Sequence, residues 1–535
     1  MTRRPRITIA IGAASAALLL TACGGGGGEG SGGENEISVR GCTPQNPLIP
    51  AATNETCGGN VLDGLHAKLV RYDPETAEPS NDIAESIETE DNQTFTVKIK
   101  EGYKFSDGTD VLAHNFVDAW NFSASCKQGY QSGYFFEPIE GYADMAADED
   151  DNCNPKTEEM SGLEVVDDHT FTIKTANPVS NLPMRLGYTA FAPLPDSFFD
   201  DPDAYAEMPV GSGPFKMVEN NEQQMVLEKN PEYAGDNPGQ VDKVTFKIYN
   251  DEAAAYNDVV ANQLDFTEVV PTDQLVGDAW KASLPDRHGI AEAGVFQSLS
   301  FSPTDEQLAD PKKRQALSMA LDRELITQQV FNGSREPADG WVAPSVDGYE
   351  GGACGEYCEY DPEKAKKMWD EAGGYDGPLT LSVNGDGGHR QWAEAVCNNW
   401  RNDLGVDCQV VLTPDFKTLR NQITKREIKG IFRSGWQMDY PHIENFLTPL
   451  YKTDASSNDT EYSNPEFDKK IVEADSAKDP AEANKLYQEA EQMLPEEMTA
   501  IPQWYQTVPY AYSDRVDNVK VTPFQQLDLS SITVK

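Results

Sequence analysis

The chain has 535 residues, of which 89 are acidic and 43 basic, and its formal net charge is −46 at pH 7. So large a negative charge argues against nucleic acid and anionic lipid surfaces as partners. The length exceeds what one hydrophobic core holds, and aromatic and β-branched residues run throughout, so we expect two or three folded domains rather than a disordered acidic protein.

The amino-terminal residues have the pattern of a secretion signal. A short cationic stretch precedes an apolar run from Ile7 to Leu20, which is too short to span a bilayer in a mature protein. It ends in Leu-Thr-Ala-Cys23, which resembles a lipobox, the motif at which cleavage leaves a lipidated cysteine first. The alternative is an ordinary signal peptide with a coincidental cysteine. We predict a signal peptide over residues 1–22, lipid attachment at Cys23, and a glycine-rich tether over 23–35 outside the cytoplasmic membrane.

The cysteine count indicates disulfide bonds. Nine cysteines less the one in the lipobox leave eight, an even number in a secreted chain. A metal site is disfavoured, because Cys354 and Cys358 have neither a histidine nor two further thiols close by in sequence. Although eight cysteines allow 105 connectivities, the spacing favours four local pairs, namely Cys42–Cys57, Cys126–Cys153, Cys354–Cys358 and Cys397–Cys408.

The first third of the chain predicts an α+β arrangement. Apolar residues alternate with polar ones in 92–100 and 167–174, as in half-buried strands, and recur at helical spacing in 111–120. Residues 70–192 are therefore expected to form a unit of their own. Further predictions are a first strand at 36–39, a short helix or turn at 60–70, and a turn at 102–108.

The later part alternates strands and helices, which is typical of an α/β domain. Asp310 and Pro311 predict the N-cap and first position of a helix, in which Leu317, Leu321 and Leu325 form a buried stripe. The other predicted elements are a loop at 209–214, a strand at 244–248, helices at 365–372 and 391–404, a strand at 406–412, and an aromatic segment at 501–512 that passes between lobes.

The sequence offers no catalytic motif. It has no His-Glu-x-x-His, no phosphate-binding glycine loop and no dinucleotide-binding fingerprint, and its six histidines are isolated from one another. We therefore predict a protein that is not an enzyme and that holds neither cofactor nor metal.

Six blocks of the chain carry a family resemblance. They are residues 92–116, 209–216, 230–246, 314–323, 360–366, and Gly435-Trp436 with Asp439. Together they strongly resemble the extracellular solute-binding proteins of peptide ABC importers, the oligopeptide- and dipeptide-binding proteins of family 5. The resemblance implies an α/β fold with two lobes that are joined by a hinge and close like a clamshell. This is the periplasmic-binding-protein-like fold of type II, in its three-domain form. It implies a first lobe of residues 36–69, 193–293 and 506–535, an inserted domain of 70–192, and a second lobe of 294–505.

The resemblance also implies partners. A protein of this kind captures extracellular peptides and delivers them to a membrane permease, while ATPase subunits supply the energy. We expect a monomer that meets the membrane only through its lipid anchor and binds no nucleic acid.

The stretch from Arg433 to Pro441 is the candidate ligand site. A carboxylate such as Asp439 suits the amine of a peptide, because charge-assisted hydrogen bonds are the strong ones. An extended backbone can pair with a ligand as an added strand, and an arginine can fork onto a carboxylate.

The resemblance gives these residues roles. Asp439 falls on the family's amine-binding aspartate, and Gly435, Trp436 and Gln437 fall on main chain that pairs with the peptide, so that the Trp436 side chain serves as packing. Arg433 falls on an arginine that receives a ligand carboxylate. Further candidates are Phe416 as a pocket aromatic, Tyr440 beside Asp439, and Ala51 and Ala52 as a backbone contact from the first lobe.

Other functions stay open on the sequence alone. The ligand of such a binder could instead be a nickel chelate, haem or an oligosaccharide. The chain could also be a secreted peptidase, or a structural or signalling lipoprotein.

Overall fold

The computed structural model describes residues 35–146, 153–249, 251–385, 388–455 and 457–535. The predicted signal peptide, the lipidation site at Cys23 and the tether up to residue 34 lie outside the described residues. Within the described ranges, no helix has the length and apolar character needed to cross a membrane.

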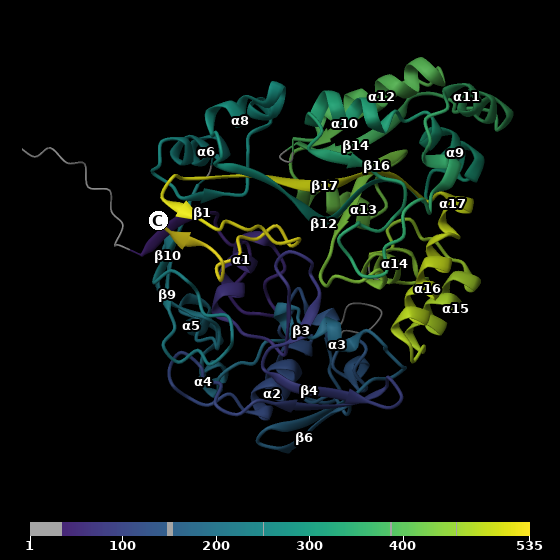
Figure 1. Ribbon diagram of the computed structural model, residues 1–535. Helices are drawn as coiled ribbons and strands as arrows, with labels where there is room; N and C mark the ends of the chain where they lie inside the picture. Colours follow the sequence, from purple (N-terminus) through teal and green to yellow (C-terminus); the bar gives the residue numbers. More distant parts are fainter. Residues whose placement is uncertain (1–34, 147–152, 250, 386–387, 456) are drawn as a thin grey trace, which may run out of the picture.

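One large mixed sheet runs through most of the molecule (Figure 1). It has eleven strands, and β13 (Arg335–Pro337) joins it by pairing with β17. The order of the other strands is β15 (Cys408–Thr413), β14 (Leu379–Asn384), β16 (Ile431–Gln437), β12 (His288–Phe301), β17 (Ala500–Tyr512), β11 (Phe266–Thr267), β1 (Glu36–Gly41), β10 (Lys243–Ile248), β9 (Gln224–Lys229) and β8 (Phe215–Asn220).

The strands β12 and β17 connect the two sides of this sheet. They have 14 and 13 residues and pair antiparallel, so each spans roughly 45 Å at about 3.3 Å per residue. Their register shifts between Glu292 and Phe296 and again between Gln297 and Ser298. Such irregularities bend and twist a strand, which suits a hinge between lobes.

We call the side with β1 and β8–β11 the first lobe, and the side with β14–β16 the second lobe. The first lobe also contains α1 (Thr56–Leu65), α6 (Glu252–Val260), α7 (Thr272–Leu275), α8 (Ala279–Ser283) and the carboxyl-terminal pair β18 (Val516–Asp517) and β19 (Thr533–Val534). The second lobe contains α9 (Pro311–Met319), α10 (Arg323–Phe331), α11 (Pro362–Glu371), α12 (Arg390–Asp403), α13 (Phe416–Thr424), α14 (Glu444–Tyr451), α15 (Pro465–Asp475), α16 (Pro480–Glu491) and α17 (Leu494–Glu497).

A smaller sheet forms the inserted region, at the bottom of Figure 1. Alternating residues of its strands pack against α2, where Phe116 stacks on Phe171 and Trp120 meets Phe171 edge-on. The sheet order is β4 (Ala84–Thr89), β5 (Thr94–Ile99), β7 (Thr170–Lys174) and β6 (Leu163–Asp167), and the region also contains β2 (Val70–Tyr72), β3 (Pro79–Asn81), α2 (Ala113–Ala124), α3 (Leu182–Arg185), α4 (Asp196–Asp200) and α5 (Pro202–Glu207).

The buried apolar side chains gather in clusters that follow the chain. The largest cluster draws on residues 296–505, and a second draws on residues 49–205 together with Tyr440. A third combines buried residues from 37–65, 215–295 and 508–532. The domain boundaries expected from the family resemblance stay a prediction.

All four predicted disulfides are present: Cys42–Cys57, Cys126–Cys153, Cys354–Cys358 and Cys397–Cys408. The last pair ties α12 to β15. Each bond closes a local loop, so the disulfides constrain individual elements rather than one lobe against the other.

The predicted stripe of Leu317, Leu321 and Leu325 on one helix is wrong. The helix that begins at Pro311 ends at Met319, and a second one begins at Arg323, where the Asp322 carboxylate accepts a hydrogen bond from the Leu325 N–H. Because a second helix begins at this N-cap, Leu325 does not continue the buried face of the first helix. It is 43% exposed, while Leu317 and Leu321 are buried.

The predicted strand over 167–174 is shorter than expected. Residues Asp167 to Thr170 form the turn of the hairpin between β6 and β7, where the Asp167 carboxylate accepts a hydrogen bond from the His169 N–H. An aspartate that bonds the backbone two residues on favours a turn over a strand.

Candidate functional site

A cavity of about 550 Å³, called the ligand cavity below, lies where both lobes and the inserted region meet. Its size lies within the range of small-molecule sites in proteins. Its wall includes residues 53–56 and 524–526 of the first lobe, Tyr72, Tyr134 and Tyr188 of the inserted region, and Arg433, Gly435, Trp436, Gln437, Met438 and Asp439 of the second lobe.

The structure brings six of the nine predicted ligand residues to this wall. They are Phe416, Arg433, Gly435, Trp436, Gln437 and Asp439. Tyr440, Ala51 and Ala52 are buried beside the cavity without lining it, and Thr53 lines it instead. The Ala51 carbonyl accepts a hydrogen bond from the Ser132 N–H (3.0 Å), and the Ala52 N–H donates to the Ile49 carbonyl (2.9 Å). These two backbone groups are therefore already engaged in hydrogen bonds within the protein.

Strand β16 presents one open edge to the cavity. It pairs with β12 along its whole length, from Ile431 opposite Phe301 to Gln437 opposite Val295. On its other side, β14 pairs only with Ile431 and Phe432. Among the described strands, the five residues from Arg433 to Gln437 therefore have a partner on one side only, and this edge can accept an extended ligand as an added strand.

Asp439 follows this strand, and the amide of Asn445 holds its carboxylate. The Asn445 Nδ2 donates to Asp439 Oδ2 (3.0 Å), and Asn445 Oδ1 accepts from the Asp439 N–H (2.8 Å) and from Trp436 Nε1 (3.0 Å). From the inserted region, the Tyr134 hydroxyl lies 3.5 Å from the same carboxylate oxygen. One asparagine thus orients both Trp436 and Asp439.

The carboxylate of Asp439 has no cationic partner among the described residues. Burial raises the pKa of Asp439 to about 7, and the nearby charge of Glu444 adds to the effect, although the hydrogen bonds from Asn445 and Tyr134 oppose it. An acid in this state gains strongly from a ligand cation, because the ligand supplies the missing charge partner.

Arg433 is held inside the second lobe. Its guanidinium lies over the Phe416 ring, 5.4 Å from the centroid, and its Nη1 donates to Asn384 Oδ1 over 3.4 Å. Phe416 itself is 48% exposed and begins α13. The two predicted residues therefore form one cation–π pair at the cavity wall.

Sequence reasoning missed Asn445 and Tyr134. Asn445 lies in α14, six residues after Asp439, and its role depends on the turn at residues 440–443 that folds the helix back toward the strand. Tyr134 belongs to η1 (Gly133–Phe136), which the fold places opposite β16. The aromatic run at 134–136 is a visible signal, but nothing in it distinguishes a cavity residue from core.

The described residues include no group of three or more histidine, cysteine, aspartate or glutamate side chains arranged to hold a metal ion.

Comparison with known families decides the relationship. Residues 78–458 match the family of bacterial extracellular solute-binding proteins, family 5. The chain belongs to this family. As a family 5 solute-binding protein it has the two-lobed α/β fold in which the cavity described above lies between the lobes.

Several relatives of this family 5 protein span nearly all of its length. The oligopeptide-binding protein OppA of Bacillus subtilis is 26% identical over 516 residues, which cover 92% of this chain and 92% of the relative. The periplasmic oligopeptide-binding protein OppA of Salmonella typhimurium is 28% identical over 462 residues, with coverage of 83% and 82%.

Solved structures show the same fold. The Escherichia coli murein tripeptide-binding protein MppA superposes with a TM-score of 0.77 at 22% identity, covering 94% of this chain and 98% of that one. Haemophilus influenzae OppA, in complex with the peptide RPPGFSPFR, superposes with a TM-score of 0.77 at 23% identity, with coverage of 94% and 99%.

Proposed function

We propose that this protein captures peptides outside the cytoplasmic membrane and delivers them to the permease of an ABC transporter. The peptide amine binds Asp439, and the peptide main chain lies along the open edge of β16 at Gly435 to Gln437. The names of the relatives in Bacillus subtilis and Salmonella typhimurium, both oligopeptide-binding proteins, support this choice of ligand.

One observation carries the proposal. Asp439 is a part-buried carboxylate that ends an unpaired strand edge, is oriented by Asn445, and has no cation beside it among the described residues. A peptide supplies both things that this arrangement lacks, a cation and a row of amide groups. Because main-chain contacts ignore side-chain identity, they suit a binder of many peptides.

The remaining parts of the proposal concern location and partners. A lipid on Cys23 holds the mature protein at the outer face of the membrane, and residues 24–35 act as its tether. The protein works as a monomer that binds without chemical change of its ligand, and the partner subunits hydrolyse ATP.

The decisive experiment identifies what the protein carries. Protein purified without refolding is examined by native mass spectrometry, and we expect a mixture of peptides. Affinity for a recovered peptide is then measured with Asp439→Asn, which should weaken binding by roughly 1.5–3 kcal/mol, the value of a hydrogen bond to a charged group.

A matched control accompanies this variant. Asp203→Asn removes the same charge from an exposed position on α5, away from the cavity. It should bind the peptide as the unchanged protein does. Recovery of a bound molecule that is not a peptide, or normal peptide affinity in Asp439→Asn, would contradict the proposal.

A further inference from the structure

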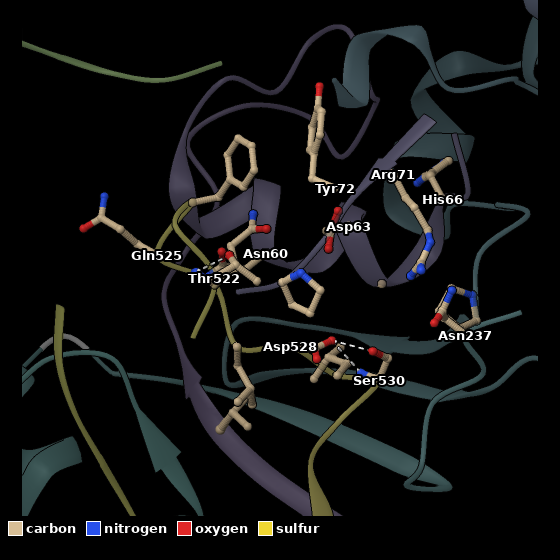
Figure 2. A pocket seen from close by; sticks show the side chains of 18 of the residues that line it. Asn60, Asp63, His66, Arg71, Tyr72, Asn237, Thr522, Gln525, Asp528 and Ser530 are labelled. Atoms are coloured by element: carbon tan, nitrogen blue, oxygen red, sulfur yellow. Dashed lines mark hydrogen bonds between the residues drawn. The ribbon is translucent and has the colours of Figure 1, made fainter. Parts of the chain in front are cut away.

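A second cavity lies directly beside the ligand cavity. It has a volume of about 170 Å³ and is called the side cavity below (Figure 2). Tyr72 and Phe524 stack with ring centroids 5.2 Å apart and line both cavities. The other shared wall residues are Asp63, Lys68, Gln525 and Gln526.

These shared residues make the side cavity a neighbour of any bound ligand. Lys68, Gln525 and Gln526 have long, unbranched side chains, and changes of side-chain rotamer are common when a ligand binds. We therefore expect rotation of these three side chains to open a connection between the two cavities when a ligand binds.

The side cavity contains polar groups whose hydrogen-bonding capacity is unused. The Arg71 guanidinium extends along the cavity wall toward Asn237 in Figure 2, and it makes no side-chain hydrogen bond or ion pair with the rest of the described chain. The Nε of Arg40 and the Oδ1 of Asn60, both in residues that line the same cavity, are buried and have no hydrogen-bond partner in the described ranges. Native proteins seldom leave buried polar groups unsatisfied, so these two atoms, together with the half-buried Arg71 guanidinium at the same cavity, indicate a polar occupant.

The carboxylates around the cavity are already engaged. Asp63 pairs with Lys68 (2.5 Å), Glu268 pairs with Arg40, and Asp82 accepts a hydrogen bond from the Tyr103 hydroxyl (2.9 Å). Asp73 and Asp528 accept hydrogen bonds within their own turns, from the N–H groups of Glu75 and Ser530. The five donors of Arg71 therefore stay available to a ligand.

We propose that Arg71 forms a subsite that receives a carboxylate of the bound peptide. The guanidinium fork matches a carboxylate in two parallel hydrogen bonds, and the Arg40 Nε lies at the same cavity as a further donor. The inference rests on the proposed function, and it places the carboxylate of the ligand in the side cavity, between β2 of the inserted region and the first lobe. Arg433, by contrast, already has Phe416 and Asn384 as neighbours.

Two groups of a peptide offer this chemistry, the C-terminal carboxylate and an acidic side chain. Three pools of short synthetic peptides separate them. The first pool has free C-termini and no acidic residues, the second has the same sequences with C-terminal amides, and the third is amidated and contains one glutamate in each peptide.

The test measures the affinity of each pool for the unchanged protein and for Arg71→Gln. The unchanged protein should bind the free-carboxylate pool, the glutamate pool, or both, about ten- to a hundredfold more tightly than the purely amidated pool. Arg71→Gln should bind all three pools equally, at the affinity of the amidated pool. Arg71→Lys should fall between, because it keeps the charge and loses the fork.

Control variants separate this inference from its alternatives. Arg390→Gln removes one exposed cation at the start of α12 and should behave as the unchanged protein. A preference for carboxylates that survives in Arg71→Gln and disappears in Arg433→Gln overturns the subsite while leaving the proposed function intact. If the unchanged protein binds no pool, the proposed function and the subsite both fail.

Discussion

At the scale of single residues, Asp439 decides whether the ligand cavity carries a negative charge near neutral pH. Burial raises the pKa of Asp439 to about 7, so the carboxyl of the ligand-free protein is half protonated there. A peptide ammonium requires the ionised form. Binding of an amine must therefore displace a proton whenever the pH lies below this value.

The first prediction concerns the pH dependence of binding. Below about pH 7 the affinity for a peptide with a free amine should fall by up to about tenfold per pH unit, until the pKa of the bound state is reached. Titration calorimetry from about pH 8 to about pH 5 measures this, and Asp439→Asn should show a flat profile. An unchanged affinity across this range in the native sequence would show that the amine lies elsewhere.

The second prediction concerns the ligand-free protein. Because the pKa of Asp439 is about 7 in the folded protein against a usual 3.8, the folded state binds more protons than the unfolded chain between these values. The contribution of Asp439 to the free energy of unfolding therefore decreases as the pH rises from 3.8 to about 7. Above pH 7 the free energy of unfolding of Asp439→Asn should exceed that of the native sequence by about 1–3 kcal/mol, after allowance for partial exposure. The variant should therefore unfold at a higher urea concentration.

The same measurement supplies its own control. The difference between Asp439→Asn and the native sequence should shrink as the pH falls and vanish near about pH 3, below both pKa values, where the carboxyl is mostly protonated in both states. A variant that is less stable at every pH would mean that the hydrogen bonds to Asn445 and Tyr134 outweigh the cost of the buried charge.

At the scale of elements, the open edge of β16 depends on close contact with β12. A Cβ atom on Gly435 would lie 2.6 Å from the Phe296 carbonyl oxygen, which is backbone and cannot rotate away. Gly435→Ala should therefore move β16 away from β12, lower the stability by about 1–3 kcal/mol and weaken ligand binding. Ser434→Ala, on the same strand, should change stability by less than about 0.5 kcal/mol. Equal effects of the two variants in urea unfolding would refute the close-contact explanation.

A second set of elements joins the inserted region to the second lobe. Arg185 of α3 pairs with the buried Glu444 of α14 (3.0 Å), and Asn181 Nδ2 also donates to this carboxylate (3.0 Å). Burial alone raises the pKa of Glu444, but the Arg185 guanidinium and the Tyr440 hydroxyl hold it below its usual value. Tyr440, expected to touch the ligand, instead donates to Glu444 and lies under Arg185.

This contact should stabilise the arrangement of the inserted region against the second lobe that the structure shows. Arg185→Ala leaves Glu444 buried without its cation, at a cost of about 3–5 kcal/mol, which opening of the cleft relieves by hydration. We expect a larger radius of gyration in small-angle X-ray scattering and a weaker peptide affinity. Replacing both charges, in Arg185→Met with Glu444→Gln, should restore much of the compactness. The same radius of gyration in Arg185→Ala and the native sequence would exclude this role.

At the scale of the whole molecule, one sheet continues through both lobes along β12 and β17. We therefore expect the described domains to unfold as one cooperative unit rather than lobe by lobe. A peptide at a hundred times its dissociation constant should raise the free energy of unfolding by about 2.7 kcal/mol and shift the whole transition. Circular dichroism and tryptophan fluorescence check this, and two separate transitions, of which the peptide moves only one, would contradict it.

Local sequence patterns predicted many of the helices and strands, because the periodicity of apolar residues within a segment largely determines its secondary structure. The alternation at Phe95, Val97 and Ile99 identified β5, and Trp392, Val396 and Trp400 identified the buried face of α12. The family resemblance identified the fold and directed attention to Asp439. Asn445, Tyr134 and the pair of Arg185 with Glu444 could not be predicted, because their roles arise only when distant segments meet. Tyr134 and Asp439 are 305 positions apart, and Asn181 and Glu444 are 263 apart.

The strand pairing of the first lobe also determines when this protein can fold during secretion. Strand β1, close to the end that carries the predicted lipid anchor, pairs with β10, and β11 pairs with β17, which ends 23 residues before the carboxyl terminus. Contacts of such long sequence separation form late, after the intervening chain is available. The first lobe therefore cannot be completed until nearly the whole chain has crossed the membrane, while the core of the second lobe needs the chain only as far as residue 505. The cavity between the lobes is then the last part of the molecule to assemble, so an incompletely exported chain should bind no ligand.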